Sequence, residues 1–286
     1  MRIEVNGVRI FFDIEGAKLV PDGPVMREKP TLILLHGGPG MDHTYWRPLF
    51  SQLADVAQVI YIDQRGCGRS DRGSKGAWTL AQWGDDVHAF CAALDIDRPV
   101  VCGSSFGGEV AMAYAARHPD HPSKLMLLSA SARLNLDYIG AAFDRLGGPA
   151  AREAAERFWR DGSMQDALDY MRVCVPLYFR TPQDADRDAR AIPNTELTMQ
   201  YLAAGGEAQR CNFLPDLPRI QCPTLVMGGE DDPVTTIDDM ADIASALPSH
   251  LVRFERIPNC GHGTFFDAPE RTLAVIREFI ATEVAA

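Results

Sequence analysis

The sequence lacks the features that mark membrane proteins and proteins that bind nucleic acids. Its 286 residues contain no uninterrupted apolar stretch as long as a membrane span requires. Basic residues are not in excess: the net charge is −11 at pH 7, which argues against binding to nucleic acid or to anionic membrane surfaces. The opening segment, residues 1–5, contains no apolar stretch of the kind found in signal peptides. We therefore expect a cytoplasmic protein with one sizeable domain, or one domain with an insertion.

Paired cysteines are also missing. The chain has seven cysteines, and none of them belongs to a Cys-x-x-Cys pair. An odd, scattered set of this kind is typical of reduced thiols in a cytoplasmic protein, so we expect no zinc site. Two of the thiols, Cys67 and Cys260, lie in loops beside glycines, where we expect partial exposure.

The sequence does contain a regular alternation of short apolar runs and helical stretches. Asn6-Gly7 predicts an N-terminal hairpin, and a loop is expected over roughly residues 16–30. Continuous apolar runs predict strands that are covered on both faces, over residues 31–35, 59–62, 100–102, 125–128 and 224–227. A last strand is predicted over residues 251–254. Helices are predicted over residues 79–94, 107–117, 237–247 and 269–281. The alternation indicates an α/β protein with a mostly parallel central sheet and helices on both faces.

This alternation is interrupted over residues 133–218. The segment has no good strand, and it has helical patterns over 150–160, from Ser163 onward, and over 194–204. We therefore predict a core domain made of residues 1–132 and 219–286 and a helical cap domain over 133–218. Because long insertions in compact domains are usually functional, we interpret the cap as a lid over the active site. The alternative interpretation is helical decoration without a functional role.

A serine stands between one predicted strand and the next helix in the pattern Gly103-Ser104-Ser105-Phe106-Gly107. This Gly-x-Ser-x-Gly pattern is typical of a nucleophile elbow, a sharp strand-to-helix turn that exposes a serine hydroxyl above a sheet. Glycines are needed on both sides because neighbouring backbone passes close to the turn. Ser105 is therefore the candidate nucleophile.

A serine hydroxyl becomes a useful nucleophile only when a base takes its proton and a third group orients that base. In chains with this elbow the acid and then the histidine follow the serine in sequence. The acid is expected directly after the strand 224–227, where we choose Asp232 and keep Asp231 as the alternative. The base is His262, which lies between two glycines after the last predicted strand.

A glycine-rich loop, His36-Gly37-Gly38-Pro39-Gly40, directly follows the first strand of the predicted sheet. Backbone N–H groups in such a loop and in the residue after the nucleophile can stabilise an oxyanion, which indicates Gly38 and Phe106, with Gly37 as a further candidate. No Gly-Lys-Ser/Thr follows the loop, so it is not a phosphate-binding P-loop. Trp46, a little further along, is a candidate residue of the substrate pocket.

Taken together, these motifs resemble those of the α/β-hydrolase superfamily, and within it those of the proline iminopeptidase group of serine peptidases. The resemblance rests on the loop at 36–40, the segment Asp63-Gln64-Arg65-Gly66-Cys67-Gly68-Arg69-Ser70, the elbow and the two later loops with the acid and the histidine. It implies removal of an N-terminal proline from small peptides, with lid and loop carboxylates that hold the free ammonium group. On this basis Glu196 is a candidate substrate-binding residue, with a plain acidic residue in a helix first turn as the alternative. Members with a clear ammonium clamp often carry Glu directly after the triad Asp, whereas this chain has Pro233.

The sequence thus predicts a serine hydrolase that forms an acyl-enzyme, without a metal or an organic cofactor. Its expected partner is a small-molecule or short-peptide substrate, with no nucleic acid and no membrane. The first hypothesis is an aminopeptidase or amidase that resembles proline iminopeptidase, and the second is an esterase or lactonase for a small ester. A non-catalytic binding protein is disfavoured by the intact order of serine, acid and histidine, and an epoxide hydrolase or dehalogenase would need Asp at position 105.

Overall fold

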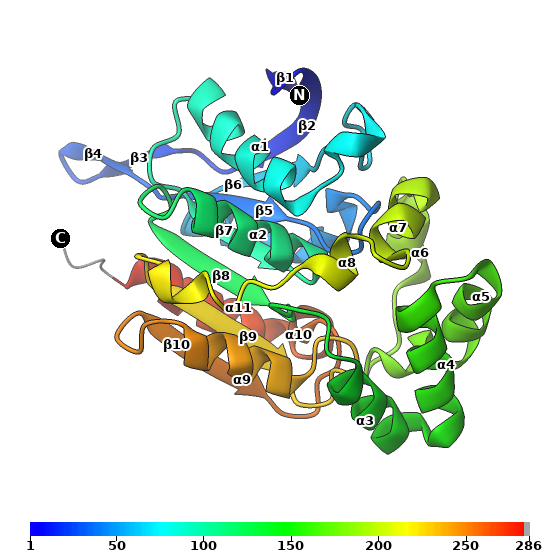
Figure 1. Cartoon of the computed structure of the whole chain (residues 1–286). Helices are drawn as coiled ribbons and strands as arrows, with labels where there is room; N and C mark the ends of the chain where they lie inside the picture. Colours follow the sequence, from blue (N-terminus) through cyan, green and yellow to red (C-terminus); the bar gives the residue numbers. More distant parts are fainter. Residues whose placement is uncertain (283–286) are drawn as a thin grey trace.

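A computed structural model describes residues 1–282 and shows an eight-stranded sheet with helices around it (Figure 1). The strand order is β1-β2-β6-β5-β7-β8-β9-β10. The six strands from β6 to β10 in this order are parallel, and the β1–β2 hairpin pairs antiparallel with the β6 edge. The predicted mostly parallel α/β sheet is therefore confirmed.

The strands lie where the apolar runs predict them. Four of the parallel strands, β5, β7, β8 and β9, are buried at every position, because helices cover both faces of the sheet. The strands of the main sheet are β1 (Arg2–Val5), β2 (Val8–Glu15), β5 (Thr31–Leu35), β6 (Gln58–Asp63), β7 (Val100–Ser104), β8 (Lys124–Leu128), β9 (Thr224–Gly229) and β10 (Val252–Ile257).

The N-terminal hairpin forms as predicted, and both turn residues, Asn6 and Gly7, have positive φ angles of 46° and 77°. The expectation of a loop over residues 16–30 is wrong in part. The chain there forms a second hairpin, β3 (Leu19–Asp22) with β4 (Val25–Glu28), around Gly23 with φ 58°. Its residues are almost all exposed, so no buried face produced an apolar pattern that could have revealed it.

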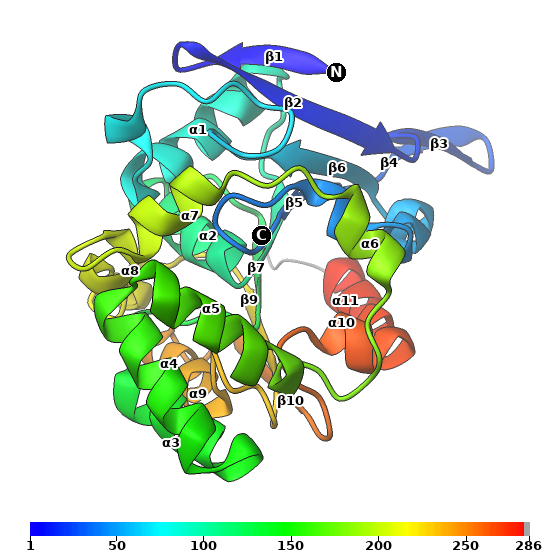
Figure 2. The ribbon, with the colours of Figure 1, turned by 90° about the vertical axis from the view of Figure 1, so that its right-hand side faces the viewer.

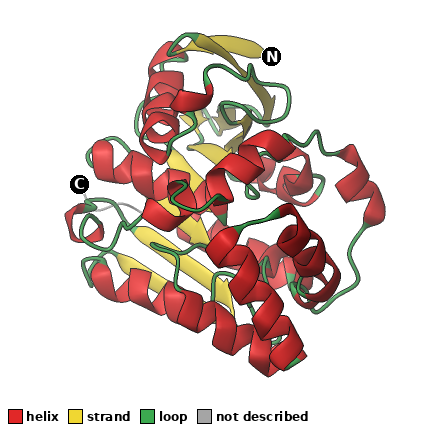
Figure 3. Cartoon of the chain, turned by 45° about the vertical axis from the view of Figure 1, so that its right-hand side comes forward, coloured by secondary structure: helices red, strands yellow, loops and turns green. Residues whose placement is uncertain are grey.

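Helices cover the two faces of the sheet (Figure 3). One face packs against α1 (Leu80–Ala93), α2 (Phe106–Arg117) and α9 (Ile237–Ala246), and the other against the 3-10 segment Leu49–Asp55, α10 (Thr264–Asp267) and α11 (Pro269–Ala281). Local signals begin two of these helices: Thr79 accepts a hydrogen bond from the Gln82 N–H before α1, and Thr236 forms a capping box with Asp239 before α9.

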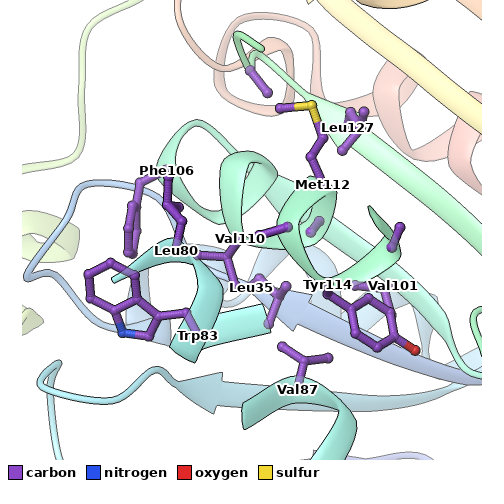
Figure 4. Packing of buried hydrophobic residues seen from close by; sticks show 14 of the residues in the cluster. Leu35, Leu80, Trp83, Val87, Val101, Phe106, Val110, Met112, Tyr114 and Leu127 are labelled. Atoms are coloured by element: carbon purple, nitrogen blue, oxygen red, sulfur yellow. The ribbon is translucent and has the colours of Figure 1, made fainter. Parts of the chain in front are cut away.

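The core on the first face is built largely from α1 and α2 against the sheet (Figure 4). Trp83 on α1 and Phe106 on α2 meet edge to face, with ring centroids 4.9 Å apart. Both side chains are almost wholly buried. The helix that follows Ser105 is thereby fixed against the sheet by its own first residue.

Between β8 and β9 the chain leaves the sheet and forms a helical insertion, whose helices lie over one end of the strands (Figure 2). Three of its helices match the sequence patterns, and α3, α6 and α8 were not predicted. The insertion has its own apolar cluster around Phe143 and Tyr170, and its two ends meet where Arg133 bridges Asn212. Its helices are α3 (Leu136–Gly147), α4 (Pro149–Asp161), α5 (Met164–Val173), α6 (Ala185–Arg190), α7 (Thr195–Leu202) and α8 (Glu207–Arg210).

Every cysteine of the chain is a free thiol, and six of the seven are buried. The expected partial exposure of Cys67 and Cys260 is wrong, since both are at most 1% exposed. Burial raises the pKa of Cys67 to about 12 and that of Cys260 to about 11, so both thiols stay protonated near neutral pH. Within residues 1–282, no helix has both the length and the apolar character needed to cross a bilayer.

Candidate active site

Ser105 stands at the junction of β7 and α2 in the backbone conformation that an elbow requires. Its φ and ψ are 52° and −123°, which is unusual for a residue with a side chain. Neighbouring backbone packs tightly around the turn: a Cβ on Gly103 would lie 2.0 Å from the Gly107 carbonyl oxygen, and one on Gly107 would lie 2.1 Å from that of Leu35. Only glycine fits at these two positions, for the steric reason that the sequence pattern implies.

The two loops after β9 and β10 bring an acid and a histidine to the serine. The Ser105 Oγ lies 3.1 Å from His262 Nε2, and His262 Nδ1 lies 2.9 Å from Asp232 Oδ2. A carboxylate only accepts hydrogen bonds, so Nδ1 carries the proton of a neutral imidazole and Nε2 is left free to accept one from the serine. The hydroxyl, the imidazole and the carboxylate therefore form one row of hydrogen bonds.

Asp232 is held by several donors besides the histidine. Its side chain is fully buried, and it accepts hydrogen bonds from the backbone N–H groups of Val234 and Thr235 and from the Thr235 hydroxyl, at 2.8–3.0 Å. The neighbouring Asp231 instead points outward and pairs with Arg145 of the insertion at 2.6 Å. Of the two candidate acids, the geometry therefore selects Asp232.

The helical insertion contacts the histidine loop directly. The backbone N–H of His262 donates to the carbonyl of Tyr178 at 2.6 Å, and the Tyr178 ring meets the imidazole edge to face at 5.4 Å. The Tyr178 hydroxyl in turn lies 2.7 Å from that of Tyr170 on α5. The position of the imidazole therefore depends on the insertion as well as on the sheet.

The loop after β5 lies against the other side of the serine. Gly38 has φ 56°, and its N–H and that of Phe106 donate to no acceptor within residues 1–282. The Gly37 N–H is already engaged with the Tyr45 hydroxyl at 2.6 Å. The Phe106 side chain packs against Trp83 (Figure 4). Of the two loop glycines, Gly38 is thus the one with a free donor.

Buried ionic and polar contacts fix this loop and the one after β6. Asp63 accepts from the His43 ring at 2.6 Å and from the Arg69 N–H at 2.7 Å. Arg65 holds Asp86 through two hydrogen bonds of 2.6 and 2.7 Å. His36 is fully buried, and burial lowers its pKa, so it is a neutral packing residue and not a second base.

A cavity of about 170 Å³ opens at Ser105 between the loop after β5 and the insertion. Its walls are largely apolar and aromatic, and its charged groups come from Asp42 and from α6. We name it the apolar cavity, and it is lined by Gly37, Gly38, Met41, Asp42, Tyr45, Ser104, Ser105, Phe179, Arg187, Asp188, Ala191, His262, Phe265 and Phe266.

Ser105 also lines a second, smaller cavity of about 50 Å³, which we name the Glu109 cavity. Glu109 lies one helical turn after the serine on α2, and its carboxylate accepts a hydrogen bond from the Tyr201 hydroxyl on α7. Burial raises the pKa of Glu109 to about 7. A carboxyl group of this kind beside a candidate nucleophile is a functional candidate, and no motif of the sequence pointed to it.

Comparison with known proteins accounts for this arrangement. The family model for the alpha/beta hydrolase fold matches residues 30–269. The chain belongs to the α/β-hydrolase fold family. The match runs across the elbow, both later loops and the insertion, so the family explains the sheet and the order of the site residues together.

Individual α/β hydrolases similar to this chain carry different names. A proline iminopeptidase of Thermoplasma volcanium is 24% identical over 99% of this chain and 96% of its own, and monoacylglycerol lipase abhd6-B of Xenopus laevis is 24% identical over 89% and 76%. The crystal structure of proline iminopeptidase from Mycobacterium smegmatis superposes with a TM-score of 0.79, at 24% identity, over 98% of this chain and 97% of that one. The chain thus resembles proline iminopeptidases, as the motifs indicated, and also resembles a lipase.

Two of the three predicted substrate-binding residues do not lie in the cavities of this α/β hydrolase. Gly37 lines the apolar cavity. Trp46 does not: its side chain is fully buried in the core, stacked on Tyr45, and of these two neighbours Tyr45 is the one that lines the cavity. Glu196 is exposed, pairs with Lys75 at the surface and lines neither cavity at Ser105.

The sequence reasoning also missed several residues that line the cavities. Tyr45 stands next to Trp46 in the 3-10 segment His43–Trp46, and a segment this short has no periodicity that tells the inward side chain from the outward one. Arg187 lies on α6, a helix of six residues with too few apolar positions to be recognised. Their contribution to the site depends on contacts between segments far apart in the chain.

Proposed function

We propose that this α/β hydrolase is a serine hydrolase that works through an acyl-enzyme on Ser105 and cleaves esters of small acids. The observation that carries the proposal is the single row of hydrogen bonds from the Ser105 hydroxyl through His262 to the buried Asp232, at 3.1 and 2.9 Å. A nucleophile within hydrogen-bond reach of a base, with that base held by a third group, is the arrangement that activates a serine.

In the first half of the reaction, Ser105 Oγ attacks the ester carbonyl carbon while His262 Nε2 takes the hydroxyl proton. The imidazolium that forms is stabilised by Asp232, whose oxygens also accept hydrogen bonds from Val234 and Thr235. The tetrahedral intermediate places its negative oxygen toward the N–H groups of Gly38 and Phe106. His262 then protonates the alcohol as the carbon–oxygen bond breaks, leaving the acyl group on the serine.

The second half repeats these steps with water. His262 takes a proton from a water molecule, which attacks the acyl carbon, and the same two N–H groups stabilise the second intermediate. Collapse breaks the bond to Ser105, and the proton on His262 returns to the serine oxygen. The products are an acid and an alcohol, and the enzyme is restored.

The lining of the apolar cavity supports an ester substrate over a peptide with a free amino terminus. An ammonium group needs a carboxylate within reach. Glu196, the residue that the resemblance offered, is at the surface, and Pro233 stands where clamp-bearing relatives often have Glu. The two aspartates that line this cavity are already paired, Asp42 with Arg69 at 3.0 Å and Asp188 with Arg187 at 2.7 Å.

A second candidate function, release of an N-terminal residue from a small peptide, is favoured by one observation. Glu109 lines the other cavity at Ser105, and Arg133, a cation of the same lining, pairs with Asp242 and not with Glu109. A substrate ammonium group placed there would ionise the carboxyl and pair with it. This candidate makes Glu109 essential for amide cleavage and dispensable for ester cleavage.

Paired assays test the proposal. We expect rapid hydrolysis of p-nitrophenyl acetate and butyrate or of a lactone, and slow or no release of p-nitroaniline from Pro-p-nitroanilide. Ser105→Ala should fold normally and lose at least about 10⁴-fold in kcat. Wild-type turnover by Ser105→Ala would overturn the mechanism.

The same assays separate the two candidate substrates. Strong turnover of the prolyl amide alone, abolished in Glu109→Gln, would replace the ester proposal by the aminopeptidase. Ester turnover that is unchanged in Glu109→Gln, with the prolyl amide inert, would remove the aminopeptidase.

A further inference from the structure

The wall of the apolar cavity opposite the loop after β5 contains a buried positive charge. Arg187, on α6 of the insertion, is 8% exposed and lines the cavity together with Ser105. Its guanidinium stacks over the ring of Phe266 at 4.0 Å, and Phe266 also lines the cavity. The stacking fixes the plane of the guanidinium at the edge of the site.

The hydrogen bonds of Arg187 leave part of its donor set free. Its Nε and Nη2 donate to one oxygen of Asp188, at 2.9 and 2.7 Å, and its Nη1 donates to Gln183 at 2.9 Å. A guanidinium has five N–H donors, and the remaining ones have no acceptor within residues 1–282. The guanidinium is therefore held in place and still has N–H donors that can bind a further acceptor.

The two aspartates that line this cavity differ in burial and in the number of hydrogen bonds that they accept. Asp42 is fully buried and accepts from Thr44, Arg69 and Ile192. Asp188 is the sequence neighbour of Arg187, and its side chain is 64% exposed, so water screens its attraction. Asp188 is thus the less firmly held of the two acids. Because it is also the partner of Arg187, an incoming anion competes with this exposed carboxylate for the guanidinium.

We infer that the apolar cavity receives a substrate group that ends in a carboxylate, which Arg187 binds, so that the preferred esters carry a free acid group beyond an apolar linker. The inference rests on the proposed ester hydrolase activity and names the substrate class of the same site. The walls of this cavity include Met41, Tyr45, Phe179, Phe265 and Phe266. Apolar walls suit a methylene or aromatic linker, and a planar guanidinium suits a carboxylate.

Burial of the guanidinium supports this assignment. A charge taken out of water is costly unless it is paired, and one exposed aspartate is a weak partner. A substrate carboxylate that enters the cavity displaces water and forms charge-assisted hydrogen bonds in an environment of low polarity. The arginine then contributes specificity and holds the ester carbonyl over Ser105.

Matched pairs of esters test the inference, because the carboxylate can belong to the acyl part or to the leaving group. For the acyl part, the p-nitrophenyl monoester of adipic acid is compared with the ester in which an isopropyl group replaces the free carboxylate. For the leaving group, p-acetoxybenzoate is compared with p-isopropylphenyl acetate. We expect kcat/KM to be at least about tenfold higher for the charged member of one pair.

Arg187→Gln should abolish this preference. Arg190→Gln is the matched control, since Arg190 lies on the same helix, is exposed and pairs with Asp184. It should keep the preference. Asp188→Asn removes the competing negative charge and keeps a side-chain oxygen that accepts from Arg187, so KM for the charged ester should fall by at least about threefold.

The outcomes separate this inference from the proposed function. Cleavage of neutral and charged esters at equal rates by the wild type would overturn the carboxylate site and leave the ester hydrolase intact. A preference that survives in a folded Arg187→Gln would also overturn it, as would an unchanged KM in Asp188→Asn. Failure of the wild type to cleave any of the four esters would overturn the proposed function and this inference together.

Discussion

At the scale of single residues, two adjacent aspartates illustrate how surroundings decide chemistry. Asp231 and Asp232 follow the same strand and have the same side chain. The first is a surface partner of Arg145, and the second is buried beside His262 with three other donors on its oxygens. Only the second can orient an imidazole, and the order of residues alone does not distinguish them.

Substitution by asparagine should therefore affect activity strongly at one aspartate and hardly at the other. Asp232→Asn should lower kcat by about 10⁴-fold, because an amide no longer stabilises the imidazolium or favours the required tautomer. Asp231→Asn removes only an exposed ion pair and should stay within about twofold of wild type. Steady-state kinetics on p-nitrophenyl acetate measures both. A larger loss in Asp231→Asn would reassign the acid.

Glu109 leads to a prediction about stability and pH. Burial raises its pKa in the folded protein to about 7 from the ordinary 4.5, so folding favours the protonated carboxyl. The unfolded chain therefore releases this proton at lower pH than the folded protein. Stability from this group is complete below about pH 4.5 and is lost as pH rises through about 7.

Glu109→Gln cannot ionise and should escape that loss. Thermal unfolding of both proteins between pH 5 and pH 8 measures the effect. The melting temperature of the variant should rise relative to wild type as pH increases, because all other titrating groups are shared by the two proteins. Parallel pH profiles for the two proteins would contradict the assigned pKa.

At the scale of elements, the short Gly-x-Ser-x-Gly pattern of the elbow is explained by how distant parts of the backbone pack around it. The sequence pattern requires glycine at positions 103 and 107. The structure shows that any other residue at either position would place its Cβ about 2 Å from a carbonyl oxygen of neighbouring backbone. The serine keeps its positive φ because β7 and α2 are packed against β5 and hold the turn between them.

Gly103→Ala should therefore be strongly destabilising. Backbone atoms surround the added methyl group and cannot move aside without separating the strand from the helix, so we expect a loss of about 3 kcal/mol or more. Gly76→Ala is a suitable comparison, because the nearest atom to its Cβ would be 3.7 Å away. Urea unfolding measures both changes. Equal stability of the two variants would contradict the close packing at the elbow.

At the scale of the whole molecule, a buried lysine joins the central sheet to the C-terminal helix. Lys124 at the start of β8 is 4% exposed, and its Nζ donates to the carbonyls of Phe279 and Ile280 at 2.8 and 2.7 Å. These are carbonyls of the last turn of α11, which have no partner within their own helix. The contact spans more than half of the chain.

Lys124→Met keeps the length of the side chain and removes its donors, so both carbonyls lose their partner. We expect the free energy of unfolding to fall by about 2 kcal/mol or more. Lys75→Met, at an exposed lysine that pairs with Glu196, should change it by less than about 1 kcal/mol. Chemical denaturation with an unchanged m-value gives the comparison. A smaller effect at position 124 than at position 75 would show that the helix end needs no cap from β8.

Much of this molecule followed from the sequence by itself. The apolar runs predicted the strands of the parallel sheet, because strands covered on both faces must be apolar throughout. Local chemistry predicted the turn at Asn6-Gly7 and the start of a helix at Thr79, since these depend on a few neighbouring residues. The order of Ser105, Asp232 and His262 was readable because each follows a strand whose carboxyl end lies at the same edge of the sheet.

Only the tertiary structure decided what surrounds that serine. Trp46 turned into the core and Tyr45 into the cavity, and Glu196 turned to the surface. Glu109 on α2 and Arg187 on α6 came to line the two cavities at Ser105. The physical reason is that strand positions follow from burial and capping along a few residues, whereas a cavity is built from side chains of distant segments. Which side chains face it depends on how the insertion packs over the sheet, and no short stretch of sequence contains that information.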